Sequence, residues 1–192
     1  MDNNKIFLND GLVIWLTGLS GAGKSTISES LKDMIMSRTK NSVKVLDGDE
    51  IRENLSPDLD FSKEGRTRNI RRISYVAKCI VDCCGVAIVA AISPYKEDRQ
   101  YAKKMIREDR FFEIFVDCDI DTLIERDVKG LYKKALSGEI ENFTGISDPY
   151  EIPKNPNCIV NSNTQSLEES LEIIKDSLNA FLQEGKRDMY YI

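Results

Sequence analysis

Residues 18–26 read GLSGAGKST, a complete GxxxxGKS pattern that directly follows the apolar run at 12–16. The glycines let the backbone curl so that successive N–H groups point inward at an anion, and Lys24 supplies a positive charge for the β- and γ-phosphates of a nucleotide. Ser25 offers a hydroxyl to Mg²⁺, and the helix that begins here presents its positive end to the same anion. We therefore expect a nucleoside triphosphate site rather than a glycine-rich turn with an incidental lysine.

The pattern requires a strand before it and a helix after it, and the flanking sequence predicts both. The residues predicted to bind the nucleotide are Gly18, Leu19, Ser20, Gly21, Ala22, Gly23, Lys24, Ser25 and Thr26.

Apolar periodicity along the chain predicts strands that alternate with helices. We expect strands near 12–16, 43–46, 86–92, 112–116 and 158–160, and helices near 25–38, 63–84, 96–107, 166–182 and from about 120. Ser62 is the expected N-cap of the helix at 63–84, and Gly85 is its expected stop. This alternation predicts an α/β fold, a doubly wound parallel sheet with helices on both faces and ligands at the carboxyl ends of the strands.

Length and composition favour one globular domain over residues 1–192. Glycines and prolines break the regular pattern from Gly130 to Pro156, so a lid of about 128–156 is expected in this domain. No run approaches the ~20 apolar residues of a membrane span, and residues 1–10 resemble no targeting segment, so we expect a cytoplasmic protein.

A net charge of −5 argues against an extended nucleic-acid surface. The chain has no histidine, and its five cysteines lack CxxC spacing, so we expect structural thiols in a reducing compartment, with a redox switch as the less favoured alternative.

Six blocks, the glycine-rich pattern among them, have a characteristic order and spacing. They are DGDEIR at 47–52, FSKEGRTRNIRR at 61–72, ISP at 92–94, RDVKGLYKKA at 126–135, FTGISDPYE at 143–151, and the pattern itself. From Gly11 to at least Pro153 the chain resembles the adenylylsulfate kinase family. The resemblance implies a P-loop kinase that moves the γ-phosphoryl group of ATP to the 3′-hydroxyl of adenosine 5′-phosphosulfate, with Mg²⁺, as a cytoplasmic homodimer in sulfate assimilation.

The resemblance also implies roles for single residues. Phe61 and Phe143 would stack on the adenine of the sulfate-bearing substrate. The grip on its phosphosulfate and ribose would come from Arg52, Arg66, Asn69 and, from the lid, Lys129. Arg66 and Asn69 are three positions apart near a helix start, so they can converge on one ligand.

Catalysis is assigned to Asp49, Lys24 and Ser93. Asp49 is expected near the accepting hydroxyl, while Asp47 supports Mg²⁺ with Ser25 or holds its loop. Ile92 and Ser93 join the substrate wall. The family position of Ser93 is often marked as a phosphoserine intermediate, but direct transfer needs no covalent stage, so we favour a positioning role.

Two other functions remain open from the sequence. A different small-molecule or nucleotide kinase of the same fold would keep residues 18–25 but need not keep Phe61, Arg66, Asn69 and Phe143. A non-catalytic nucleotide-sensing module would be expected to carry a damaged cradle, whereas Lys24 and Ser25 are intact.

Overall fold

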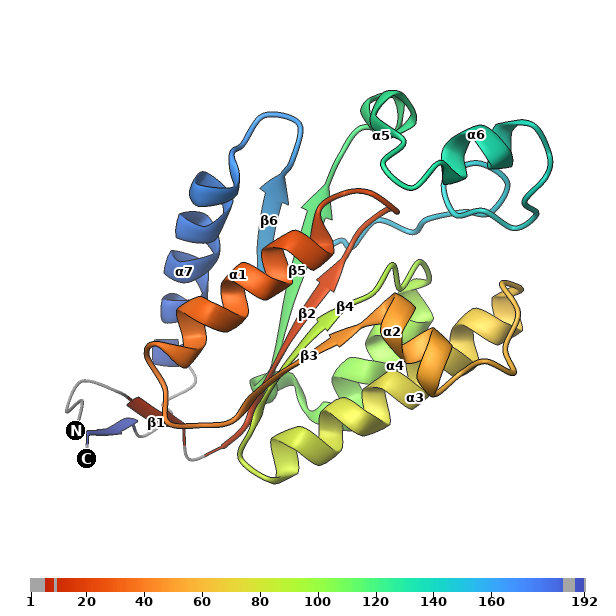
Figure 1. Ribbon diagram of the computed structural model, residues 1–192. Coiled ribbons are helices and arrows are strands. Elements are labelled where there is room, and N and C mark those ends of the chain that lie inside the picture. Colours follow the sequence, from red (N-terminus) through yellow and green to blue (C-terminus); the bar gives the residue numbers. More distant parts are fainter. Residues whose placement is uncertain (1–5, 9, 185–188, 192) are drawn as a thin grey trace.

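A computed structural model describes residues 6–8, 10–184 and 189–191. Its centre is a sheet of parallel strands in the order β3-β4-β2-β5-β6 (Figure 1). The strands are β2 (Leu12–Thr17), β3 (Val43–Asp47), β4 (Val86–Ala90), β5 (Phe111–Asp117) and β6 (Cys158–Asn161). The predicted doubly wound parallel sheet is confirmed, and β2, which runs into the glycine-rich loop, lies at its centre.

Helices cover both faces of this sheet. In Figure 1, α1 (Lys24–Met36) and α7 (Leu167–Glu184) lie on one face, while α3 (Lys63–Asp82) and α4 (Lys96–Ile106) lie on the other. The short helices α2 (Gly48–Asn54), α5 (Ile120–Arg126) and α6 (Leu131–Leu136) gather at the carboxyl ends of the strands. Ligand-binding residues are expected at that end of such a sheet.

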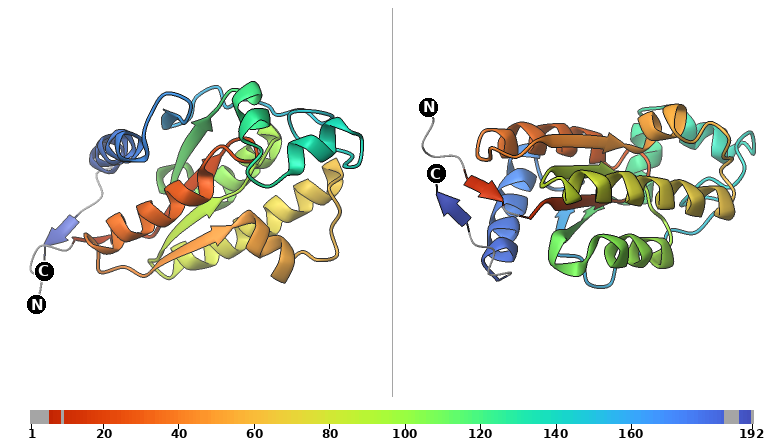
Figure 2. Two further views of the ribbon diagram at one scale, coloured as in Figure 1. Left: turned by 45° about the horizontal axis from the view of Figure 1, so that its top comes forward. Right: turned by 90° about the horizontal axis from the view of Figure 1, so that it is seen from below.

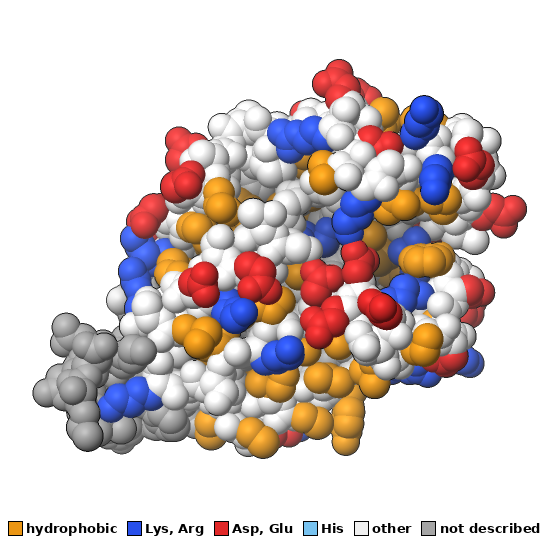
Figure 3. Space-filling view, in the orientation of Figure 1, with side chains coloured by type: hydrophobic (Ala, Val, Ile, Leu, Met, Phe, Trp, Pro, Cys, Tyr) orange, Lys and Arg blue, Asp and Glu red, His pale blue; other side chains and the backbone are white. Residues whose placement is uncertain are grey.

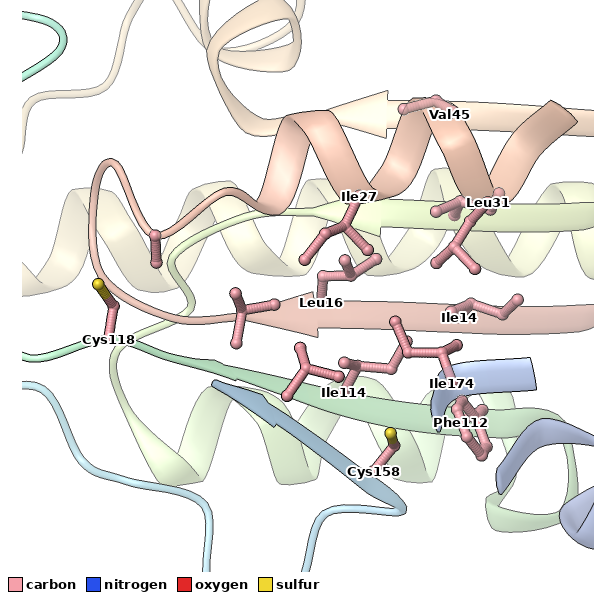
Figure 4. Close-up of a cluster of buried hydrophobic side chains, with 14 of the residues drawn as sticks. Ile14, Leu16, Ile27, Leu31, Val45, Phe112, Ile114, Cys118, Cys158 and Ile174 are labelled. Carbon is pink, nitrogen blue, oxygen red and sulfur yellow. The ribbon is translucent and has the colours of Figure 1, made fainter. Parts of the chain in front are cut away.

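Strand β2 is buried along its whole length, which explains its continuous apolar sequence. Ile14 and Leu16 point to the cluster that contains Ile27 and Leu31 of α1 (Figure 4). The alternate residues Val13 and Trp15 pack in a second cluster with side chains of α3 and α4. The loop that follows β2 therefore begins on a strand that is fixed from both sides.

Five elements were not predicted. Helix α2 follows β3 without a gap, and α6 interrupts the stretch at 130–156 that was expected to be irregular. The strands β1 (Ile6–Leu8) and β7 (Met189–Tyr191) pair antiparallel, away from α5 and α6 (Figure 2). A one-turn 3₁₀ helix, Glu108–Arg110, precedes β5.

The carboxyl end of α3 corrects two expectations. Ser62 caps the helix as predicted, because its hydroxyl accepts the Gly65 N–H at 3.1 Å. At the other end, Cys84 rather than Gly85 adopts a positive φ, of 58°. Cys79 and Cys83 are exposed, so the prediction that all five cysteines are structural is wrong for these two. The last buried residue of α3 is Val81.

Among the described residues, no helix is both long and apolar enough to cross a membrane. The expectation that residues 1–10 hold no targeting segment falls largely outside the described part of the chain.

Candidate active site

A cleft lies at the carboxyl ends of β2, β3 and β4. Its walls come from the loop between β2 and α1, the start of α2, Phe61 with α3, the segment after β4, and Val128 with Lys129. In the space-filling view of Figure 3, basic and acidic side chains lie next to one another near the middle of this face of the molecule. The topology thus collects side chains from positions 20 to 129 around one opening.

The loop 18–24 has the backbone that its glycines allow. Gly18 has a φ of +153°, and a Cβ there would lie 2.4 Å from the Val116 carbonyl oxygen. Gly23 has a φ of +97° and is the N-cap residue of α1. Side chains would strain both positions, so the curl of the loop depends on glycine.

Lys24 lies folded into this loop and is buried. Its Nζ donates hydrogen bonds to the carbonyl oxygens of Gly18, at 3.0 Å, and Leu19, at 2.7 Å. Burial, helped by the nearby charge of Lys129, lowers the pKa of the Lys24 ammonium to about 8, while Asp49 and Asp47 oppose the shift. A phosphate group that entered the loop would supply the missing negative charge.

Ser25 and Asp47 meet at the cleft floor. The Ser25 hydroxyl donates to Asp47 Oδ2 at 2.7 Å, although the two residues come from different elements. Asp47 Oδ1 accepts the Asp49 N–H at 2.9 Å and so caps α2. Asp47 therefore holds its loop, as one of the two predicted roles requires, and places two oxygen ligands side by side. Such oxygens suit Mg²⁺.

Asp49 forms an ion pair across the cleft with Lys129, at 2.5 Å from Nζ to Oδ2. Both side chains are substantially exposed, so the pair lies at the mouth of the cleft. The contact joins the start of α2 to residues that follow α5. The structure thus brings together a predicted catalytic carboxylate and a predicted substrate-binding lysine that are 80 positions apart.

Phe61 is 53% exposed and lies between two guanidinium groups. The Cζ atoms of Arg52 and Arg66 lie 4.4 and 5.5 Å from its ring centroid. Arg52 Nη1 also donates to the carbonyl oxygens of Leu59 and Asp60. Burial lowers the pKa of both guanidinium groups. The exposed ring and the two cations form one wall of the cleft.

Arg66 and Asn69 both face the cleft from α3, as their spacing predicts. Arg66 Nε donates to Phe61 O at 3.0 Å and Nη2 to Asn142 O at 2.7 Å. Asn69 is buried, and its Oδ1 has no hydrogen-bond partner among the described residues. A buried amide oxygen without a partner is costly, so it is ready to accept a ligand hydrogen bond.

Ile92 and Ser93 line the cleft just past β4. The Ser93 hydroxyl accepts from Trp15 Nε1 at 2.9 Å and donates to the Ala91 carbonyl oxygen at 3.1 Å. Ser93 is 1% exposed and has a positive φ of 45°. Its proton and a lone pair are both engaged in buried hydrogen bonds, an arrangement that fixes the segment rather than activating a nucleophile.

Phe143 does not line the cleft with the other predicted residues. It is only 8% exposed and packs edge to face against Tyr132, with ring centroids 5.0 Å apart. A stacking role for Phe143 would need an accessible ring, but Phe143 is buried, because with Tyr132 and Ala135 of α6 it extends the cluster that contains Leu16 and Ile114. Its contact with the substrate stays a prediction.

Several cleft residues were not predicted: Gly48, Ile70, Ala90, Ala91, Pro94 and Val128. They are small or apolar, and only their adjacency to the predicted blocks could have identified them.

Comparison with known proteins identifies the family. The sequence model of the family described as adenylylsulphate kinase matches residues 10–161. The chain belongs to this family. It is 47% identical over 167 residues to an adenylyl-sulfate kinase of Staphylococcus haemolyticus, which covers 87% of this chain and 83% of that protein.

Two further relatives extend the comparison. A probable bifunctional SAT/APS kinase of Sorangium cellulosum is 55% identical over 161 residues, 84% of this chain, but the match spans only 27% of its own length. The APS kinase of Mycobacterium tuberculosis, solved in complex with AMPPNP and APS, is 40% identical with a TM-score of 0.82, covering 88% of this chain and 98% of that one. The P-loop kinase fold and the family are therefore established together.

Proposed function

We propose that this chain transfers the γ-phosphoryl group of ATP to the 3′-hydroxyl of adenosine 5′-phosphosulfate, giving the 3′-phosphorylated product and ADP in sulfate assimilation. One observation carries the proposal: a single cleft combines the phosphate loop with the set Asp49, Arg52, Phe61, Arg66 and Asn69. The relative from Mycobacterium tuberculosis was solved with an ATP analogue and APS together, which supports two ligands in a cleft of this kind.

The donor half is the loop 18–26. Its inward N–H groups and the positive end of α1 would bind the β- and γ-phosphates. Lys24 Nζ, which now donates to Gly18 O and Leu19 O, would exchange these carbonyls for phosphate oxygens. An anion stabilises the charged ammonium, so the bound nucleotide would raise the pKa of Lys24 from about 8.

The Ser25 hydroxyl and the Asp47 carboxylate fit Mg²⁺, because they are adjacent oxygen donors at the cleft floor. When bound, Mg²⁺ neutralises the charge on the β- and γ-phosphate oxygens. Among the described residues, no cluster of three or more acidic, cysteine or histidine side chains is placed to hold a metal ion.

The acceptor half would orient the ribose against the donor. Asp49 is the carboxylate that would accept the proton of the 3′-hydroxyl, and Lys129, its partner at 2.5 Å, would move to the sulfate-bearing substrate when it binds. Arg52 and Arg66 would hold the phosphosulfate, Asn69 the ribose, and the exposed Phe61 ring the adenine, a contact worth about 1–3 kcal/mol.

Ser93 would act by position. The Ser93 hydroxyl donates its proton to Ala91 O and accepts from Trp15 Nε1, and neither of these partners is a general base. Direct in-line transfer from ATP predicts inversion at the γ-phosphorus, whereas a phosphoserine route predicts retention. Retention would refute the positioning role.

We also propose the remaining features that the sequence suggests: a single domain whose lid is about 128–156, a homodimer, and a cytoplasmic location. The Thiobacillus denitrificans relative is described as a hexameric APS kinase, so assemblies vary among relatives. Light scattering of the purified chain tests the dimer, and cell fractionation tests the location.

An acceptor panel tests the proposed function. Purified protein with ATP and Mg²⁺ is incubated with adenosine 5′-phosphosulfate, adenosine 5′-monophosphate, gluconate or no acceptor, and ADP is measured. We expect ADP formation only with the phosphosulfate. Equal ADP in all four reactions, or none with the phosphosulfate, would contradict the proposal and favour another small-molecule kinase or a non-catalytic module.

A further inference from the structure

The segment Ile92–Pro94, which lines the cleft after β4, accepts hydrogen bonds from three buried side chains. Thr17 Oγ1 donates to Ile92 O at 2.6 Å, and Trp15 Nε1 donates to Ser93 Oγ at 2.9 Å. Arg99 Nη1 donates to the carbonyl oxygens of Ser93, at 2.7 Å, and Pro94, at 3.1 Å. Arg99 is only 4% exposed, although it lies in the strongly charged sequence KEDRQ of α4.

The same guanidinium reaches the end of the lid. Arg99 Nη2 donates to Glu151 O at 2.5 Å, and the Glu151 N–H donates to Pro94 O at 2.9 Å. The Glu151 carboxylate also accepts the Lys96 N–H at 2.6 Å, and Tyr150 shares a hydrogen bond of 2.9 Å with Thr17 Oγ1. The lid exit at 150–151 and the wall of the cleft are thus one hydrogen-bonded unit with Arg99 at its centre.

Glu113 supplies the charge that lets Arg99 stay in this buried position. Its Oε1 lies 3.1 Å from Arg99 Nε, and both side chains are largely buried. Arg99 Nε forms the ion pair with Glu113, and Nη1 and Nη2 donate to the three carbonyl oxygens, so all three nitrogens of the guanidinium have partners. A lysine at this position would keep the positive charge, but its single ammonium group could not reach Glu113 and the three carbonyl oxygens at the same time.

The rest of the lid is held in a different way. Its other hydrogen bonds and ion pairs to the body include the exposed Lys129–Asp49 pair, the contacts of Arg66 and Tyr95 with Asn142 and Asp148, and a hydrogen bond from the Tyr132 hydroxyl to Ser20 O at 2.8 Å. Arg66 and Lys129 are also expected to bind the substrate, so their links would change during turnover. Arg99, Tyr150 and Glu151 are not among the residues expected to bind the substrate, and none of them lines the cleft, so their hydrogen bonds can persist while the other links change.

We propose that Arg99 is a positioning residue that fixes the pivot of the lid to the acceptor wall. When the lid closes, Tyr150 and Glu151 stay at a constant distance from Ile92–Pro94 and act as its pivot. Lys129 therefore reaches the same position over the acceptor substrate each time. Arg99 acts through these backbone carbonyls and not by touching the substrate. The kinetic effects expected of Arg99 rest on the proposed function, whereas its role in anchoring the lid does not depend on that function.

Arg99→Lys tests the proposal, because it keeps the charge that faces Glu113. The double variant Arg99→Met with Glu113→Gln removes both charges and leaves no unpaired buried ion. Arg107→Lys, at an exposed position just after the same helix, is the matched control. For each protein, kcat, the KM for each substrate, the melting temperature and the rate of trypsin cleavage after Lys154 are measured.

We expect both Arg99 variants to fold, to raise the KM for the phosphosulfate about tenfold and to lower kcat, with the KM for ATP within about twofold. Cleavage after Lys154 should accelerate about tenfold, since a released lid exit opens locally. Arg107→Lys should match the unmodified chain in every measurement.

Equal rises in the two KM values, or a lower melting temperature with unchanged kinetics and cleavage, would show a merely structural role and overturn the proposal. If the unmodified chain does not phosphorylate the phosphosulfate, the proposed function fails, and the cleavage rates alone then decide the role of Arg99. Unchanged cleavage in both Arg99 variants refutes it in that case as well.

Discussion

The donor and acceptor halves of the cleft are built in opposite ways. The donor half is nine consecutive residues that follow a fully buried strand and run into the first turn of α1, and its shape follows from glycines with positive φ. The acceptor half joins side chains from four separate parts of the chain through ion pairs and hydrogen bonds such as Asp49–Lys129. The first is a property of local backbone, whereas the second exists only after the chain has folded.

Removal of the donor charge should have the largest effect. Lys24→Ala is expected to lower kcat about 10³-fold, because it deletes a preorganised cation at the transferring group. Stability should hold, since the buried ammonium contributes no core packing. ADP release and thermal melting measure the two effects, with Lys32→Ala on the exposed face of α1 as the control. A rate within tenfold of the unmodified protein would refute the donor site.

Asp49→Asn should be the most damaging change in the acceptor half. We expect kcat to fall about 10²-fold, because the amide orients the hydroxyl less well and cannot take its proton. The KM for ATP should change little. Glu50→Gln, at the exposed neighbouring position, is the control. If Asp49→Asn and Glu50→Gln have the same steady-state rates, Asp49 has no role in transfer.

The two phenylalanines separate binding from packing. Phe61→Ala should raise the KM for the phosphosulfate about tenfold without changing the melting temperature, since the ring is exposed. Phe143→Ala should lower the free energy of unfolding by about 3 kcal/mol, because it leaves a cavity beside Tyr132. It is also predicted to weaken phosphosulfate binding more than ATP binding. Weaker binding of ATP than of the phosphosulfate would refute the stacking role of Phe143.

Loss of the ion pair across the cleft should have a smaller effect. Lys129→Met is expected to raise the KM for the phosphosulfate about threefold, in the range of an exposed charge pair. The difference from the unmodified protein should shrink as salt is added. Lys133→Met is the control. A change confined to the KM for ATP would assign Lys129 to the donor half.

Proton uptake reports the smallest effect. The Lys24 ammonium has a pKa of about 8 in the free protein, and the nucleotide raises it. At pH 8.5 the free protein is partly deprotonated at Lys24, so nucleotide binding should take up a fraction of a proton, and at pH 6.5 Lys24 should take up none. Calorimetry in two buffers of different ionisation enthalpy measures this, and Lys24→Ala should abolish the difference. Net release at pH 8.5 would contradict the expected shift.

The sequence predicted the donor half and the central sheet well, for a common physical reason. The strands are buried on both faces and are therefore continuously apolar, and the GxxxxGKS pattern needs only its own residues to form its curl. Ser62 was found as an N-cap because its side chain acts on the same helix turn.

The missed features depend on distant packing. The polar helix α2 has no apolar period, and Phe143 is buried only because α6 folds against it. The buried face of α3 runs through Ala77 and Val81, which leaves Cys79 and Cys83 exposed. Nothing near Arg99 in the sequence distinguishes it from a surface charge, because its partners Glu113 and Glu151 lie 14 and 52 positions further along the chain.

The position of the new phosphoryl group tests the central claim most directly. Purified protein is incubated with ATP, Mg²⁺ and adenosine 5′-phosphosulfate, and ADP is quantified while phosphorus NMR locates the phosphate on the product. We predict one ADP for each molecule of product, phosphorylated on the 3′-hydroxyl. ADP without a phosphorylated acceptor, or a phosphate at any other position, would contradict a cleft in which the two halves share one transfer.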